Sequence, residues 1–185
     1  MSDSKSVPIP KEFYNSETQQ PFKNCLMCSQ SLIQRQYVVE KAIKNYPTLG
    51  TSEVIFEYAM CLSCASKMHM ELSEESRERI EAYMASHLKN KTKNQEKKDI
   101  TASLSQCMVK ETDLSQSSEY SIYALCNGSE MVVSELPYAL SGEVQDEIMQ
   151  LLSAKSLDIM DDFIGNHFTG PPEVMEILKR RPVFI

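Results

Sequence analysis

The sequence predicts an α+β protein: a small four-cysteine module and a following helix, then a small antiparallel sheet with two to three C-terminal helices. Three observations support this class. Residues 53–61 form an apolar run rich in β-branched and aromatic residues, which is typical of a strand. Residues 119–136 contain two such runs joined by Asn127-Gly128, which indicates a β-hairpin. Several other segments have apolar residues at helical spacing, which predicts amphipathic helices.

Composition divides the chain into four parts. Residues 1–20 are polar and interrupted by prolines, so we expect a flexible tail. Residues 21–88 form the expected metal-binding module with its helix, residues 89–99 form a basic linker without apolar side chains, and residues 100–185 form an acidic α+β domain. The net charge is −7, and residues 101–185 contain five basic and thirteen acidic groups. That part of the chain would repel nucleic acid.

The sequence also indicates a cellular compartment. The N-terminal segment lacks the apolar core of a signal peptide, and no apolar run approaches the length needed to cross a membrane. We therefore expect a cytoplasmic protein with no membrane partner. Because that compartment is reducing, the six cysteines are not expected to build a disulfide framework.

In the first half of the chain, residues 36–46 are compatible with a strand or a helix, because their apolar residues alternate poorly. Helical composition begins after Cys64. A second helix is predicted to begin after Ser73, whose hydroxyl can accept a hydrogen bond from a free amide of the first turn. The apolar stripe of this helix consists of Ile80, Tyr83, Met84, His87 and Leu88.

In the second half, residues 99–110 show an alternating apolar pattern, as on one face of a strand. The alternating residues are Ile100, Ala102, Leu104 and Met108. In the hairpin that follows, a loop of Asn127 and Gly128 needs positive φ at both positions and makes Cys126 face Ser129. The other facing pairs on this apolar, buried face are then Ala124 with Met131 and Ile122 with Val133.

Three helical segments complete the predicted fold. Residues 141–155 and 156–168 each carry an apolar stripe at helical spacing. Gly170 ends the second of them, and a last helix restarts at Pro172, a position that proline tolerates in a first turn.

Four cysteines form two C-x2-C pairs, Cys25 with Cys28 and Cys61 with Cys64, separated by thirty-two residues. This spacing suits a turn that points both sulfurs at one ion, and four thiolates make a closed tetrahedral site that suits one structural Zn²⁺. Thiolates are soft ligands that exclude Mg²⁺ and Ca²⁺, whereas the geometry leaves iron open. The second pair follows a predicted strand and opens a predicted helix, where free amides and the helix dipole favour thiolates.

A cysteine knuckle, a strand-containing connection and a second ligand pair at a helix start resemble the treble-clef and zinc-ribbon class of zinc modules. The resemblance covers residues 22–75 and rests on the four cysteines alone. The connection between the pairs is longer than in common zinc ribbons, so inserted structure must be accommodated. The resemblance implies a structural metal site and leaves the function open.

Dithiol redox chemistry and plain core packing are the alternatives for these cysteines. A redox C-x2-C pair usually lies in a βαβ setting with an exposed nucleophile, whereas only the second pair opens a helix here. Soft residues crowd that pair, namely Met60, Met68, His69 and Met70. Thioethers suit copper(I), but methionine also fills gaps around a small core, which is the interpretation we favour. His69 is an alternative ligand that four thiolates make unnecessary.

Other reactive side chains are expected to be structural. Cys107 and Cys126 lie outside the C-x2-C pattern, and a second metal site there would need two further ligands. His87 lies on an apolar helical stripe, and His167 lies near a helix end that favours positive charge.

Acid–base catalysis is not indicated by the C-terminal acidic pair. Asp161 and Asp162 are not spaced to share the helical face of His167, since neighbours on a helix are three or four residues apart. The sequence also contains no nucleophile elbow and no metalloprotease signature.

These observations predict a non-enzymatic zinc-binding protein that recognises a protein partner through its acidic domain or its zinc module. One rival is a nucleic-acid-associated regulator that uses the zinc module and the lysines from Lys89 to Lys98, although this run lacks interleaved aromatic residues. The other rival is an enzyme, either a thiol-redox enzyme or one with a site built from scattered residues.

Overall fold

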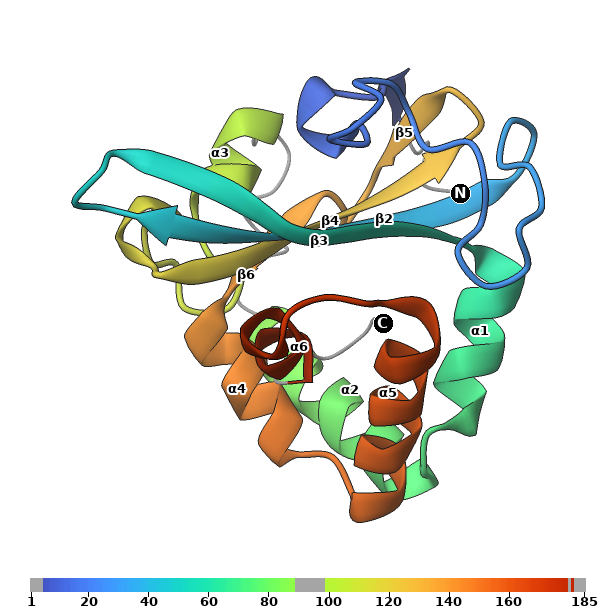
Figure 1. Ribbon diagram of the computed structural model, residues 1–185, viewed down its shortest axis with the longest axis vertical. Coiled ribbons are helices and arrows are strands. Elements are labelled where there is room, and N and C mark those ends of the chain that lie inside the picture. Colours follow the sequence, from blue (N-terminus) through green and yellow to red (C-terminus); the bar gives the residue numbers. More distant parts are fainter. Residues whose placement is uncertain (1–4, 89–98, 180, 182–185) are drawn as a thin grey trace.

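The computed structural model of the protein describes residues 5–88, 99–179 and 181 (Figure 1). A six-stranded antiparallel sheet with helices confirms the predicted α+β class. The strands are β1 (Lys5–Pro8), β2 (Gln36–Tyr46), β3 (Thr51–Cys61), β4 (Glu119–Asn127), β5 (Glu130–Val133) and β6 (Tyr138–Ser141). The helices are α1 (Leu62–Glu71), α2 (Glu74–Leu88), α3 (Ile100–Ser105), α4 (Gly142–Gln150), α5 (Ala154–His167) and α6 (Pro172–Lys179), with short 3₁₀ helices η1 (Lys11–Phe13) and η3 (Leu114–Gln116).

Strands β2 and β4 lie at the centre of the sheet. The strand order is β1-β5-β4-β2-β3, and β6 also pairs with β4. β2 is antiparallel to both β3 and β4, so both neighbours satisfy its backbone groups along most of its length. Residues 36–46 are therefore a strand. Their pattern was ambiguous because both faces of this strand are covered, and such strands do not alternate cleanly.

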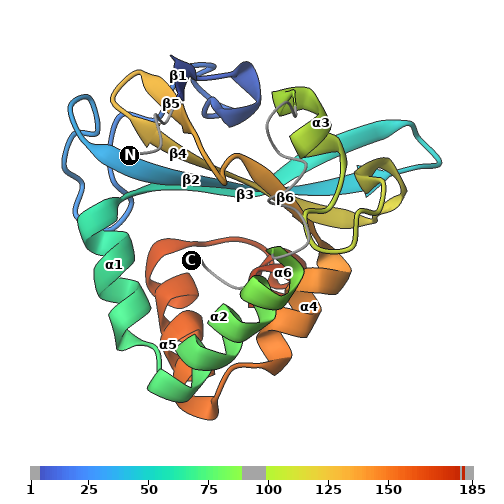
Figure 2. The ribbon, with the colours of Figure 1, turned by 180° about the vertical axis from the view of Figure 1, so that it is seen from behind.

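The sheet separates two layers of the molecule (Figures 1 and 2). Helices α1, α2, α4, α5 and α6 lie on one side, and η1 and α3 lie on the other. On the side of the five helices, Phe56 and Tyr58 of β3 make edge-to-face contacts with Phe168, and Tyr58 also meets Phe163 of α5. On the other side, Phe13 of η1 is fully buried.

The two halves of the chain share this one sheet, contrary to the expected division into a 21–88 module and a 100–185 domain. β2 comes from the first half and pairs with β4 from the second, with Tyr37 opposite Cys126. The physical reason is that β2 and β4 are buried on both faces, which neither half covers alone. The expected linker at 89–99 lies outside the described residues, except for Asp99.

Residues 5–20 also differ from the expected tail. Strand β1 pairs with β5, with Val7 opposite Met131, and Ile9 and Phe13 are buried in the core. The strand pairing of β1 and the buried side chains of Ile9 and Phe13 therefore hold this segment on the edge of the sheet.

The β4–β5 hairpin forms, but its register differs from the predicted one. Cys126 pairs with Met131 and Asn127 pairs with Glu130, so the loop is Gly128-Ser129. Of these two loop residues, only Gly128 has positive φ, at +59°. Because a shift of two residues keeps every side chain on its face, the predicted apolar face is still buried, with Cys126 and Met131 fully enclosed.

Within residues 99–110, where the alternating pattern predicts a strand, residues 100–105 form a helix. α3 covers Ile100–Ser105, and the residues after it meet the sheet at an isolated bridge between Cys107 and Ala139, where the amide of Met108 donates to the carbonyl of Ala139 at 2.8 Å. The strand beside this segment is β6, which pairs with β4 on its other side and spans only four residues, so the segment forms a single bridge there and no longer ladder.

Helices α2, α4, α5 and α6 follow the prediction. The N-termini of α2 and α5 lie side by side and are joined by hydrogen bonds. Ser73 Oγ accepts from the amide of Ser76 at 3.2 Å, and Ser153 Oγ accepts from the amide of Ser156 at 3.3 Å. The caps are also reciprocal, since the amide of Ser73 donates to Ser156 Oγ at 2.9 Å and that of Ser153 donates to Ser76 Oγ at 2.8 Å. Free amides at the starts of α2 and α5 are thus satisfied inside the core.

Candidate metal centre

The first cysteine pair lies on a tight knuckle before β2. The amide of Cys25 donates to the carbonyl of Gln30, and the amide of Ser29 donates to the carbonyl of Cys25, both at 2.9 Å. Ser29 has φ of +57°, which closes the turn. The amide of Leu26 donates to the carbonyl of Ala59 at 2.9 Å, so the knuckle is attached to β3.

The second cysteine pair lies where β3 becomes α1. Cys61 is the last residue of β3 and also the N-cap of α1, with φ of −61° and ψ of 150°. Cys64 follows in the first turn of the helix. Because the helix begins at this pair, its thiols lie where the dipole and the free amides favour negative charge. The knuckle and the start of α1 lie side by side in both views (Figures 1 and 2).

The structure brings the four predicted cysteines together. The sulfur atoms of Cys25, Cys28, Cys61 and Cys64 all lie within 4.8 Å of one another. Cys28 Sγ is 3.9 Å from Cys61 Sγ. Tetrahedral zinc with Zn–S bonds of about 2.3 Å needs sulfur separations of about 3.8 Å. The Cys28–Cys61 separation already matches this value and no other exceeds 4.8 Å, so the cluster is close to the size of a four-thiolate metal site.

Burial and backbone donors act on these thiols in opposite directions. Burial acts to raise the pKa of Cys25, but the amides of Cys28, Cys61 and Met27 oppose it and bring the pKa down to about 7. Burial, with smaller contributions from neighbouring thiols, raises the pKa of Cys61 and of Cys64. Several thiolates this close repel one another, and a bound divalent cation removes that repulsion and deprotonates the thiols.

The soft residues near the second pair do not join this cluster. Among the described residues, the group of possible metal ligands contains the four cysteines and not His69. Met60 and Met68 are buried in the core, which agrees with the gap-filling role expected of them, whereas Met70 is exposed.

The remaining cysteines are isolated buried thiols. Cys126 is fully enclosed, and burial raises its pKa to about 12. Cys107 Sγ accepts a hydrogen bond from the amide of Ser141 at 3.4 Å. The histidines have structural contacts, since the rings of His87 and His167 lie against Tyr83 and Phe163.

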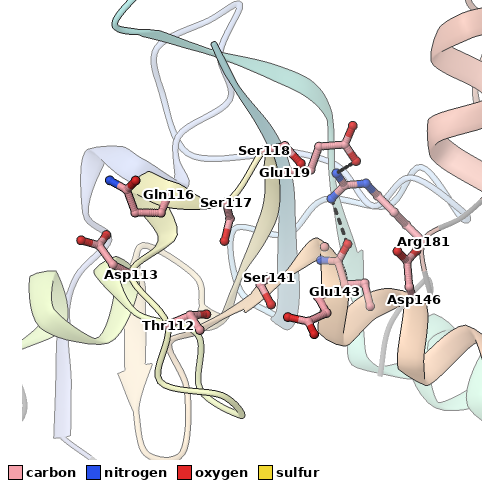
Figure 3. Close-up of a pocket in the computed structure, with 12 residues that line it drawn as sticks. Thr112, Asp113, Gln116, Ser117, Ser118, Glu119, Ser141, Glu143, Asp146 and Arg181 are labelled. Atoms are coloured by element: carbon pink, nitrogen blue, oxygen red, sulfur yellow. Dashed lines mark hydrogen bonds and ion pairs between the residues drawn. The ribbon is translucent and has the colours of Figure 1, made fainter. Parts of the chain in front are cut away.

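A polar pocket of about 750 Å³ is a second candidate site, and sequence reasoning missed it (Figure 3). It lies between the segment before β4, the start of α4 and Arg181. Arg181 is 3% exposed and donates to Glu119 at 2.9 Å, to Ser121 at 2.8 Å and to Gln145 at 3.0 Å. Four carboxylates line the pocket, those of Asp113, Glu119, Glu143 and Asp146. Within the described part of the chain, its lining includes no cysteine and no histidine.

The acidic composition of the second half was the available signal for this pocket. That excess predicts a negative surface, but which carboxylates gather around Arg181 depends on how the segment before β4 meets α4.

Comparison of the chain with protein-family models, with curated protein sequences and with solved structures found no match. Among the residues that the structure describes, no helix is both long enough and apolar enough to cross a membrane.

Proposed function

We propose that this chain is a non-enzymatic, cytoplasmic zinc-binding protein that recognises a protein partner. The observation that supports it best is the convergence of four cysteine sulfurs within 4.8 Å, from a knuckle and a helix start. Four protein ligands fill the coordination sphere of zinc, so no position is left for water or substrate. The metal then has a structural role.

The position of the cluster explains what a bound ion would stabilise. It joins the knuckle to the end of β3 and the start of α1. Two of the sulfurs are buried, those of Cys25 and Cys61, while Cys28 is exposed. Binding of zinc to a preformed set of thiolates contributes directly to folding free energy.

The partner is proposed to be basic and to dock at the pocket beside Arg181. The guanidinium of Arg181 is engaged by Glu119, Ser121 and Gln145, and the carboxylates of Asp113 and Asp146 are exposed at the pocket. Lysine or arginine side chains complement such a surface.

The metal proposal is tested by measuring zinc per chain in purified wild-type protein and in single cysteine variants. We expect one zinc per chain in the wild type and a loss of zinc in Cys25→Ser and Cys61→Ser. Cys107→Ser is the matched control, because Cys107 is equally buried but lies outside the cluster. Wild-type protein that is fully folded without metal refutes the zinc site. Wild-type protein that contains one iron per chain instead means that iron, and not zinc, occupies the same four-thiolate geometry.

The partner proposal is tested with zinc-loaded protein and an oligolysine peptide, with oligoglutamate as the negative control. Asp146→Asn is expected to weaken oligolysine binding. Asp158→Asn is the matched control, since Asp158 is an exposed aspartate outside the pocket. Equal binding by both variants contradicts docking at this pocket.

The rival functions predict different results. Binding of nucleic acid that weakens steeply with salt favours the nucleic-acid regulator, whose lysine run at 89–98 lies outside the described residues. A thiol-redox enzyme needs an accessible thiolate, whereas the thiol whose pKa is lowered, that of Cys25, is buried.

A further inference from the structure

A carboxyl group is buried in the middle of the sheet, away from the metal centre. Glu40 of β2 is 2% exposed, and its partners in register are Tyr58 of β3 and Tyr123 of β4. Directly opposite residues of paired strands point to the same face, so the three side chains lie together. An ionised carboxylate at such a position is strongly disfavoured unless its oxygens are paired.

The two oxygens of Glu40 are in different surroundings. The hydroxyl of Tyr58 donates a short hydrogen bond to Oε2. Oε1 is buried as well, and it has no hydrogen-bond partner among the described residues. Buried polar atoms in native proteins are almost always paired, and an internal water molecule pairs those that the protein does not.

A small cavity adjoins this carboxyl. Its volume is about 30 Å³, and Glu40, Tyr58, Tyr123 and Tyr138 contribute to its lining. This volume is sufficient for one water molecule, which needs two to four polar partners. Glu40 and the three tyrosines are the polar residues of its lining, and the remaining lining residues are apolar.

The groups that face Glu40 come from every element around it: Tyr58 from β3, Tyr123 from β4, Tyr138 from β6, and Arg181 beyond α6. Burial is the largest effect and raises the pKa of Glu40 to about 7, opposed by the hydrogen bond of Tyr58, by the charge of Arg181 and, least, by the nearby hydroxyl of Tyr123. The three tyrosines have pKa values raised first by burial, so they stay neutral near pH 7.

We propose that Glu40 and this cavity form a binding site for one water molecule and one exchangeable proton, which is taken up from solvent near neutral pH. The proton binds to Oε1, because Oε2 already accepts from Tyr58. Protonated Oε1 donates to the oxygen of the water, and the ionised form accepts a hydrogen from it. Ionised Glu40 attracts Arg181 and the neutral form does not, so the anchoring of Arg181 beneath the sheet depends on pH.

The proton is tested by infrared titration of the full-length protein from about pH 5 to about pH 9. We expect the carbonyl band of one protonated carboxyl group to disappear with a midpoint near the pKa of about 7. Glu40→Gln should lack this band. Glu57→Gln is the control, because Glu57 is a largely buried carboxylate of the next strand that already pairs with Lys41 at 3.0 Å.

A second variant distinguishes Glu40 from any other carboxyl. Tyr58→Phe removes the hydrogen bond to Oε2, which stabilises the ionised form, so the midpoint should move up by about one pH unit. A wild-type protein without a carboxyl that titrates near neutrality overturns the proposal, whether or not the variants fold. A band that survives in folded Glu40→Gln overturns it too.

The water is tested separately by a high-resolution crystal structure of the wild-type protein. We expect density for one water molecule within hydrogen-bond distance of Glu40 Oε1. A cavity without such density refutes the water site.

Discussion

Replacement of Gly128 by alanine tests how the β4–β5 hairpin docks on the segment that follows the first cysteine pair. Gly128 has φ of +59°, and a Cβ added there would lie 2.6 Å from the carbonyl oxygen of Ile33. The backbone has little freedom to move away. The amide of Gly128 donates to the carbonyl of Arg35, and the hydroxyl of Tyr37 donates to the carbonyl of Gly128, both at 3.0 Å.

The expected loss of stability has two parts. A left-handed backbone conformation costs a residue with a Cβ about 1–2 kcal/mol. The forced contact with Ile33 adds about 1–3 kcal/mol, the usual cost of overpacking. Gly50→Ala is the matched control, because Gly50 has φ of +64° but no atom within 4 Å of the added Cβ. We expect Gly128→Ala to lower the free energy of unfolding by about 2 kcal/mol more than Gly50→Ala does.

Urea unfolding of the two zinc-loaded variants measures this difference. Because Ile33 lies five residues after Cys28, we also expect Gly128→Ala, but not Gly50→Ala, to lose zinc more readily to a competing chelator. Equal destabilisation of the two variants would refute the reasoning, since it would mean that the hairpin does not press on Ile33.

Three further predictions follow from other parts of the structure. Ser76→Ala should cost about 1–3 kcal/mol of unfolding free energy in urea, since it leaves the amide of Ser153 without its acceptor, whereas Ser86→Ala on the exposed face of α2 should cost little. For wild type, the free energy of unfolding should fall by about 3 kcal/mol as the pH rises from 4.5, the ordinary pKa of glutamate, to above about 7, the pKa of Glu40 in the folded state. The reason is that Glu40 binds a proton in the folded state, but not in the unfolded state, within this pH window. Glu40→Gln should lack this fall in pH-dependent denaturation curves. Removal of zinc by a chelator should lower the melting temperature of the wild type and leave that of Cys61→Ser unchanged; equal effects on both would contradict a metal held by this cysteine.

The two cysteine pairs are features that the sequence alone could predict. Spacing alone indicated a knuckle at Cys25 and Cys28 and a helix start at Cys61 and Cys64, because each pair depends on backbone geometry within a few residues. The strand at 53–61 and the serine cap at Ser73 were predictable for the same reason.

Other elements were decided by distant neighbours. Residues 36–46 became a strand because β3 and β4 pair with both of their edges. Residues 100–105 became helical, and the segment after them meets the sheet beside β6, a strand of only four residues. The hairpin register shifted because Gly128, rather than Asn127, meets the carbonyl of Ile33.

The sequence by itself determined the α+β class, the two cysteine pairs and most helices, since spacing, periodicity and capping act between residues close along the chain. Only the tertiary structure decided that both halves build one sheet, that Glu40 is buried against Tyr58, and that Arg181 closes an acidic pocket. Arg181 reaches Ser121 across 60 residues of sequence, and Ser73 reaches Ser156 across 83. Contacts of this kind depend on how whole elements pack, and no local pattern in the chain encodes them.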